Sequence, residues 1–297
     1  MAGNAFGKIG FIGLGVMGEP MCRNLARKSG LPVVGLDRDA GPMQRLAADA
    51  VATAGSAADV AKACDVIFLS LPSGEIVDAL ARQPDGLLAY ARAGQTIVDL
   101  STSDVTMTRA LANDFAQRGA VFIDAPVART RAAAEAGTLS VMVGATEADF
   151  ERVRPLIATF ASDISLCGPV GCGQVVKILN NMVLFETVVA LSEAKAIGER
   201  AGVPTALLFD VLSKGSADSF ALRSHGMKAI VPGDFPERAF SVRYAHKDLR
   251  YALALAERTG VDARSARIVD GWFEQATAAG LGDMYHPVIS QEIGKKG

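Results

Sequence analysis

The segment "GQVVKILNN", residues 173–181, combines a lysine and two asparagines with an otherwise apolar helical pattern. Lys177 precedes Asn180 by three positions and Asn181 by four, so a helix would bring the three polar side chains to one face. An amine removed from water releases its proton more readily and can act as general acid and base. A neutral amide one turn away can hold a substrate oxygen without adding charge. We therefore expect proton transfer at Lys177; the plainer alternative is a lysine that reaches water from a core helix.

A glycine-rich turn near the start of the chain predicts a nucleotide site. The segment "KIGFIGLGVMGEPM" places GxGxxG between an apolar run typical of a strand and a helical stretch. Gly13 would permit the tight turn, Gly15 would let the backbone approach a pyrophosphate, and Gly18 would let the helix pack on the strand. Val16 and Met17 lie in the same turn, and the phosphates would lie at the helix N-terminus. A glycine-rich turn without a ligand is the alternative, but the strand, turn and helix together favour a dinucleotide.

An acidic residue follows the second apolar run, "VVGLDRD". Asp37 lies about 20 residues beyond the last glycine of the turn, where a carboxylate accepts hydrogen bonds from the adenosine ribose. Because a carboxylate repels a 2′-phosphate, Asp37 favours NAD over NADP as the cofactor. Arg38 beside it could bind that phosphate, so NADP remains the alternative.

Apolar strands alternate with amphipathic helices in the first half of the chain, which predicts an α/β fold with a doubly wound, mainly parallel sheet of the Rossmann type. The strand candidates are "KIGFI", "VVGLD", "DVIFLSLP", "QTIVDLS", "VFIDAPV", "SVMVG" and "DISLC". Beyond "CGPVGCG" only helical patterns remain, so we expect a nucleotide-binding domain at residues 1–167 and an all-helical substrate and oligomerisation domain at 168–297. Its helices are expected at about 174–201, 204–214, 223–231, 242–259 and 262–279.

The first of these helices is long and, from Val175 to Leu191, apolar nearly all round. Such a helix must be covered on several sides, and a second subunit could supply the cover that a small domain lacks. We therefore predict a homo-oligomer, a homodimer or a homotetramer.

Composition and charge exclude several classes of protein. A net charge of −2 leaves no basic surface for nucleic acid, and the four cysteines and three histidines show no metal-binding spacing. The N-terminal segment lacks the basic start and cleavage site of a secretory signal, and the most apolar helix contains Lys177 and Glu186, which argues against a membrane span. We expect a cytoplasmic protein that binds small molecules and contains no metal.

Four ordered segments resemble one family over essentially the whole chain. They are "GFIGLGVMGEPM", "DAPV" followed by "AGTLSVMVGA", "GPVGCGQVVKILNN" and "AHKDLRYALALA". Together they resemble the β-hydroxyacid dehydrogenases, the family of 3-hydroxyisobutyrate dehydrogenase and tartronate semialdehyde reductase. The resemblance implies hydride transfer between a nicotinamide and a short 3-hydroxy acid or its semialdehyde. It also implies that Lys177 is the acid/base residue, with Asn181 beside it.

The same resemblance implies further cofactor contacts. Leu71 and Pro72 of "SLPSG", and Ser101 and Thr102 of "DLSTS", match loops that line the nicotinamide half in the family, and both loops follow strand C-termini. Lys247 of "HKDL" matches the family's C-terminal cofactor-contacting lysine. The alternatives are a helix N-cap for the serine and threonine, and a solvated helix charge for the lysine.

The chain departs from the family after "DAPV". Most members continue with serine and two glycines that hold the substrate carboxylate, whereas here Ala128, Arg129 and Thr130 take those places. A guanidinium and a hydroxyl can replace the lost backbone contacts and suit a planar or tetrahedral anion. The segment resembles the sulfolactaldehyde reductase branch, whose members also reduce succinic semialdehyde; we expect Arg129, Thr130, Asn180 and Asn181 to hold the substrate. Arg129 and Arg131 could instead point into solvent.

Three functions follow from these residues and the resemblance. The first is an NAD-dependent 3-hydroxyacid dehydrogenase or semialdehyde reductase. The alternative substrates are sulfolactaldehyde and succinic semialdehyde, of which the latter is reduced to 4-hydroxybutyrate. The second, of another class, is a non-catalytic dinucleotide-binding reader or scaffold, against which the retained Lys177 argues. The third is an imine reductase, a group that usually replaces this lysine.

Overall fold

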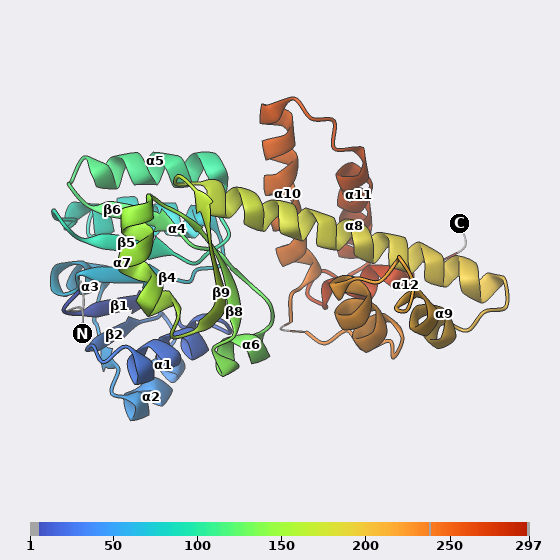
Figure 1. Ribbon diagram of the computed structural model, residues 1–297, viewed down its shortest axis with the longest axis horizontal. Coiled ribbons are helices and arrows are strands. Elements are labelled where there is room, and N and C mark those ends of the chain that lie inside the picture. Colours follow the sequence, from blue (N-terminus) through green and yellow to red (C-terminus); the bar gives the residue numbers. More distant parts are fainter. Residues whose placement is uncertain (1–5, 238, 296–297) are drawn as a thin grey trace. The chain divides into compact units, whose positions relative to one another are not determined.

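The computed structural model describes residues 6–237 and 239–295. The chain divides into two compact units, Met1–Lys177 and Ile178–Gly297. Figure 1 shows a sheet covered by helices in the N-terminal unit and helices throughout the C-terminal unit, which confirms the predicted fold class. The division falls within the long helix, and the domain boundary predicted after residue 167 stays a prediction.

The sheet of the N-terminal unit has the strand order β3-β2-β1-β4-β5-β6-β8-β7, with β9 paired to β8. Its parallel part consists of β1 (Ile9–Ile12), β2 (Val33–Leu36), β3 (Ala52–Thr53), β4 (Val66–Leu69), β5 (Thr96–Asp99) and β6 (Val121–Asp124). The carboxyl ends of β1, β4, β5 and β6 therefore meet at one edge.

The remaining strands change direction. β8 (Leu139–Gly144) is antiparallel to β6 and to β7 (Val127–Ala128) and parallel to β9 (Ala161–Gly168). The run "VFIDAPV", predicted as one strand, is divided between β6 and β7 because Pro126 has no N–H to donate to a ladder.

Helices cover both faces of this sheet, as alternate strand residues show. Phe11 and Phe68 point into a core shared with α1 (Gly18–Lys28), α2 (Ala40–Leu46), α6 (Arg131–Ala136) and α7 (Glu147–Ile157). Ile67 and Leu69 point into the opposite core, shared with α3 (Ala57–Ala63), α4 (Gly74–Arg82) and α5 (Val105–Ala116). Side chains that alternate between two apolar cores are expected for a sheet buried on both faces.

The C-terminal unit is helical, as predicted. It contains most of α8 (Cys172–Arg200), followed by α9 (Thr205–Leu212), the π-helix η3 (Leu222–Ile230), α10 (Val242–Thr259), α11 (Arg264–Ala278) and α12 (Ile289–Ile293). Phe185 of α8 lies at the centre of its core and contacts the rings of Phe240, Phe273 and His286. The segment expected at 223–231 is π-helical, and the short terminal helix α12 was not predicted.

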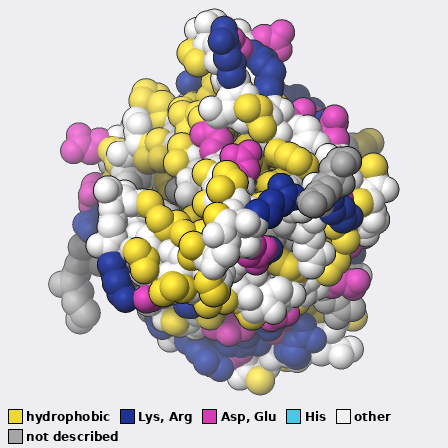
Figure 2. Space-filling model, turned by 90° about the vertical axis from the view of Figure 1, so that its right-hand side faces the viewer, with side chains coloured by type: hydrophobic (Ala, Val, Ile, Leu, Met, Phe, Trp, Pro, Cys, Tyr) yellow, Lys and Arg dark blue, Asp and Glu magenta, His cyan; other side chains and the backbone are white. Residues whose placement is uncertain are grey.

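One side of α8 is exposed in the part of the chain that the structure describes. Val176, Leu179 and Val183 are 41%, 38% and 56% exposed, whereas Ile178 and Phe185 are fully buried. By length and composition alone α8 is long and apolar enough to cross a membrane, a test that core helices of soluble proteins also pass, and 44% of its apolar window is buried inside the protein. Figure 2 shows further hydrophobic side chains spread over the face of the molecule that it presents.

Candidate active site

The glycine-rich turn between β1 and α1 has the geometry that its sequence predicts. Gly13 has φ 92°, in the left-handed region, and a Cβ on it would collide with the carbonyl oxygen of Ser70. A Cβ on Gly18 would collide with the carbonyl oxygen of Gly13, so α1 can pack this closely only without a side chain. At Gly15 a Cβ would meet no atom within 4 Å. The protein itself therefore requires the first and third glycines, whereas the second leaves open space beside the turn.

Asp37 lies beside this turn at the end of β2. Its carboxylate accepts hydrogen bonds from the backbone N–H of Leu14, at 2.5 Å, and of Asp39, at 2.9 Å. These contacts fix the carboxylate next to the glycine-rich loop, where a ribose would lie in a dinucleotide fold. Arg38, the next residue in the chain, is exposed.

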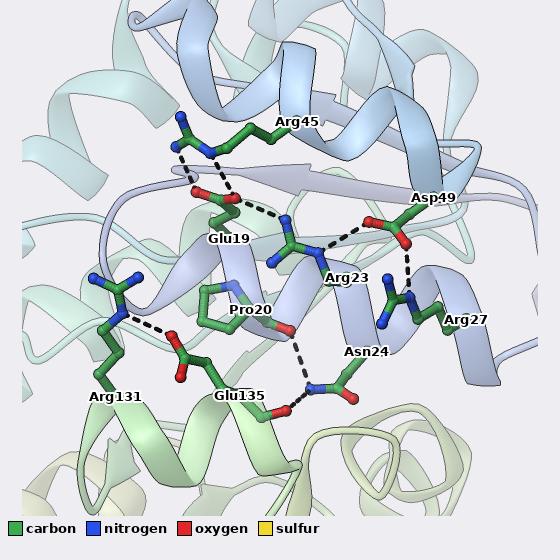
Figure 3. A network of polar contacts seen from close by, with 9 residues as sticks. All are labelled: Glu19, Pro20, Arg23, Asn24, Arg27, Arg45, Asp49, Arg131 and Glu135. Carbon is green, nitrogen blue, oxygen red and sulfur yellow. Dashed lines mark hydrogen bonds and ion pairs between the residues drawn. The ribbon is translucent and has the colours of Figure 1, made fainter.

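Ion pairs hold α1 to its surroundings (Figure 3). Glu19, in the first turn of α1, accepts hydrogen bonds from Arg45 and Arg23, and Arg23 also reaches Asp49. The pKa of Glu19 is lowered to about 2, chiefly by the hydrogen bond from Arg45, so Glu19 stays charged over the physiological pH range. The side-chain amide of Asn24 donates to backbone carbonyls of Pro20 in α1 and of α6, which ties the two helices together.

The two loops predicted to line the nicotinamide half contact each other. The backbone N–H of Leu71 donates to Oγ of Ser101, at 2.9 Å, and the N–H of Ser101 donates to Asp99. Pro72 is exposed beside Leu71. The alternative that Ser101 and Thr102 cap the next helix is wrong, because Asp104 is the N-cap of α5 and accepts from the first-turn amides.

Two buried carboxylates that the sequence analysis missed lie at this edge. Asp99 ends β5, Asp124 ends β6, and the two are paired in register. Asp124 accepts the N–H groups of Gly171, at 2.7 Å, and Gln174, at 2.8 Å, at the start of α8. Burial raises the pKa of both Asp99 and Asp124 to about 6, although hydrogen bonds oppose the shift. An aspartate at the end of each of two adjacent strands was the available signal.

Lys177 lies on α8, three residues after Gln174, and is only 8% exposed. Asn181, one turn further on, is 2% exposed, and its amide donates to Oδ2 of Asp248, at 2.7 Å. Asn180 is exposed and donates its side-chain N–H to Oδ1 of Asn181. The lysine and the second asparagine are therefore buried polar groups, whereas the first asparagine has a different environment.

Lys247 is not a simple solvated charge. Its ammonium donates to Oδ1 of Asp248, at 2.7 Å, and lies 4.9 Å and 4.8 Å from the ring centroids of Tyr244 and Tyr251. Asp248, 1% exposed, thus binds both Lys247 and Asn181. This carboxylate was also missed from the sequence, although it stands within the "HKDL" motif.

Arg129 has an unusual backbone for a residue with a side chain, with φ 86°. Its Nη1 donates to the carbonyl of Thr138, at 2.7 Å, and to Oγ of Ser162, while Nη2 pairs with Asp163 at 2.8 Å. The side chain is 40% exposed, so it is held by the protein and still open to solvent. Thr130, next in the chain, is the N-cap of α6.

Arg131 has a different environment from Arg129. It forms an ion pair with Glu135 one turn along α6, and the two side chains are 65% and 52% exposed (Figure 3). This pattern is typical of a solvated helix surface.

One group of side chains has the composition of a metal site. His246, Asp270 and Glu274 on α10 and α11 have ligand atoms within 4.8 Å of one another. Arg250 donates to Nε2 of His246 and to Glu274, so a cationic side chain already hydrogen-bonds two of the three residues. We assign no metal to it.

Gly15 provides a test of the nucleotide site. Because its side-chain direction is open, Gly15→Ala should leave the thermal midpoint unchanged but obstruct the approach of a pyrophosphate. We expect the Kd for NADH, measured by fluorescence titration, to rise by at least about tenfold, or 1.4 kcal/mol. Gly271→Ala, at another open glycine, is the control. Equal Kd values for Gly15→Ala and wild type would argue against this site.

Asp124 should give the protein a measurable pH dependence. Its folded-state pKa of about 6 lies above the ordinary value of 3.8, so its contribution to stability is present at low pH and lost as pH rises through 6. Between pH 5 and pH 7 this loss is about 1.4 kcal/mol for one such group. Urea unfolding at both pH values should show a smaller change for Asp124→Asn than for wild type. Identical changes would contradict the assigned environment of Asp124.

Comparison with known proteins identifies the family of this chain. The family model for the NAD-binding domain of 6-phosphogluconate dehydrogenase matches residues 8–168, and that for the NAD-binding of NADP-dependent 3-hydroxyisobutyrate dehydrogenase matches residues 171–290. The 2-(hydroxymethyl)glutarate dehydrogenase of Eubacterium barkeri is 37% identical over 275 residues, 93% of this chain and 91% of its own. The 2-hydroxy-3-oxopropionate reductase of Escherichia coli is 33% identical over 287 residues, 96% of this chain and 97% of its own.

Among solved structures, the 3-hydroxyisobutyrate dehydrogenase of Mycobacterium tuberculosis with L-serine is similar throughout. The TM-score is 0.88 at 31% identity, over 97% of this chain and 99% of the other. The chain therefore belongs to the β-hydroxyacid dehydrogenase family, that of 3-hydroxyisobutyrate dehydrogenase, and is an NAD(P)-dependent oxidoreductase.

Proposed function

We propose that this enzyme interconverts a short anionic 3-hydroxy acid and its semialdehyde, with NAD as cofactor and Lys177 as general acid and base. The observation that carries the proposal is the burial of Lys177 on α8, one helical turn before the buried amide of Asn181. Burying an ammonium costs free energy unless it is paired, so lysine is seldom buried in this way and its burial points to a specific role. The relatives named above, which act on hydroxy acids or an oxo acid, support the same reaction class.

The roles of the residues follow from their chemistry. A bound nicotinamide supplies or accepts the hydride. As the aldehyde is reduced, the ammonium of Lys177 gives a proton to the carbonyl oxygen; in the reverse direction the amine takes the hydroxyl proton. Asn181, oriented by Asp248, holds the substrate oxygen without adding charge.

The cofactor preference rests on Asp37. Its carboxylate is fixed beside the glycine-rich turn, where it would accept from a ribose hydroxyl and repel a 2′-phosphate. Arg38 supports the NADP alternative, as does the NADP-dependent family whose model matches the C-terminal unit. A lower KM for NADPH than for NADH would reverse the preference.

The substrate anion is assigned to Arg129, with Thr130, Asn180 and Asn181 as further contacts. Arg129 has a backbone conformation that favours glycine, at a cost of about 1–3 kcal/mol, and such strained residues cluster at functional sites. Three protein contacts already orient the guanidinium, and the side chain remains partly exposed to solvent. A carboxylate or a sulfonate suits this fork, so succinic semialdehyde and sulfolactaldehyde are the alternative substrates.

We also propose a homo-oligomer. The exposed apolar residues of α8 and the exposed Leu207, Val211 and Phe220, at 54%, 56% and 57%, would be buried by a second subunit. A light-scattering mass equal to one chain of 30.9 kDa would contradict this.

The first test is an assay of NADH oxidation with sulfolactaldehyde, succinic, methylmalonic and tartronic semialdehydes. We expect turnover of at least one, and Lys177→Met should lower its kcat by about 10²–10⁴-fold while NADH binding is retained. Lys195→Met, a lysine of the same helix paired with Glu199, is the control. No turnover of any aldehyde would favour a non-catalytic dinucleotide-binding protein. A kcat near that of wild type in Lys177→Met would exclude Lys177 as the acid.

The second test addresses the anion. Arg129→Ala should raise the KM for the accepted aldehyde by on the order of 10², the loss expected for one charged hydrogen-bonded contact. Arg131→Ala, which removes a neighbouring exposed arginine, should leave KM nearly unchanged. If the two variants have equal KM values, Arg129 is a surface residue.

A further inference from the structure

A continuous set of buried and partly buried polar contacts joins the ends of three strands to the first turn of α8. It includes the loop after β4, through the N–H of Leu71, and the loop after β5, through Ser101 and Ser103. It ends at β6, where the carboxylate of Asp124 accepts from the helix backbone. Gln174 is the residue that contacts both of the last two strand ends.

The side chain of Gln174 is completely buried and uses both ends of its amide. Nε2 donates to the carbonyl of Ser101, at 2.8 Å, and Oε1 accepts from the N–H of Ser103, at 3.0 Å. Its own backbone N–H donates to Oδ2 of Asp124, at 2.8 Å. Because these contacts come from two strand ends, they fix both the position of the helix start and its rotation about its axis.

The two sides of this contact carry groups with assigned roles. Ser101 also accepts from the N–H of Leu71, and both residues line the loops assigned to the nicotinamide half. Lys177 follows Gln174 by three residues on α8, so the two side chains lie on neighbouring positions of one helical face. A shift of the helix start would move the amine relative to those loops.

We propose that Gln174 is a positioning residue, which holds Lys177 at the correct distance from the loops that line the nicotinamide. The inference rests on the proposed role of Lys177 as the acid. Gln174 does not take part in the chemistry, because both ends of its amide are engaged by backbone groups. Misplacement of a reacting group by about 1 Å can cost on the order of 10² in rate.

Gln95 offers a closely matched control. It is also a buried glutamine of the N-terminal unit, 2% exposed, and its Nε2 donates to the carbonyls of Ala61 and Cys64, at 2.7 Å and 2.8 Å. It precedes β5, whereas Ser101 follows it, so Gln95 lies at the opposite end of the same strand. Gln95→Leu and Gln174→Leu therefore remove similar buried contacts at opposite edges of the sheet.

The experiment compares these two variants of the full chain with wild type. Gln174→Leu should lower kcat for the accepted aldehyde by about 10- to 100-fold, with the KM for NADH within about twofold of wild type. Gln95→Leu should lose a similar amount of thermal stability and retain kcat. The same kcat in both variants would overturn the proposal.

Amide hydrogen exchange at residues 171–177 gives a readout that does not depend on turnover. It should be faster in Gln174→Leu than in wild type and unchanged in Gln95→Leu, because only the former releases the helix start. If wild type reduced no aldehyde, the proposed function would fail and exchange alone would decide whether Gln174 fixes the helix. Unchanged exchange in Gln174→Leu would overturn the inference in that case as well.

Discussion

The buried carboxylate of Asp124 joins the sheet to the helix that carries Lys177, and the rest of the site depends on this contact. It accepts two backbone N–H groups at the start of α8, which would otherwise be unsatisfied, and burial raises its pKa toward neutrality. The surrounding backbone has no room for side chains: a Cβ on Gly144 or Gly173 would collide with the Asp124 carboxylate. The glycines before Lys177 therefore have a structural reason, since they let the helix begin directly against the strand end.

Glycines also allow close packing at the nucleotide turn after β1. Gly13 and Gly18 are required by the fold itself, whereas no contact within the described chain requires a glycine at Gly15. Asp37 is held against this loop by two backbone amides. Both halves of the site thus use strand ends at one edge of the sheet, where parallel strands direct their carboxyl ends toward ligands.

The sequence predicted the parts of the fold that depend on local pattern. The alternating strands and helices, the glycine-rich turn and the extent of α8 follow from hydrophobic period and turn chemistry. The break at Pro126, the π-helix that contains His225 and the short α12 were missed, because tertiary contacts decide them. Likewise the sequence pointed to Lys177 and Asn181, but Asp124, which binds the backbone at the start of α8, and Asp248, which accepts from Asn181, become evident only when distant segments are brought together. The family resemblance places a glycine where Arg129 stands, which was a signal for the glycine-like backbone of this residue, but no pattern indicated that it would pair with Asp163.

The most direct measurement is a crystal structure with NAD⁺ and the hydroxy acid that the enzyme accepts. We expect Nζ of Lys177 to lie within about 3 Å of the substrate hydroxyl, a hydrogen-bond distance, with the carbon that bears this hydroxyl facing the nicotinamide ring. A structure in which Nζ faces bulk water, remote from the nicotinamide ring, would show that Lys177 is not the general acid and base.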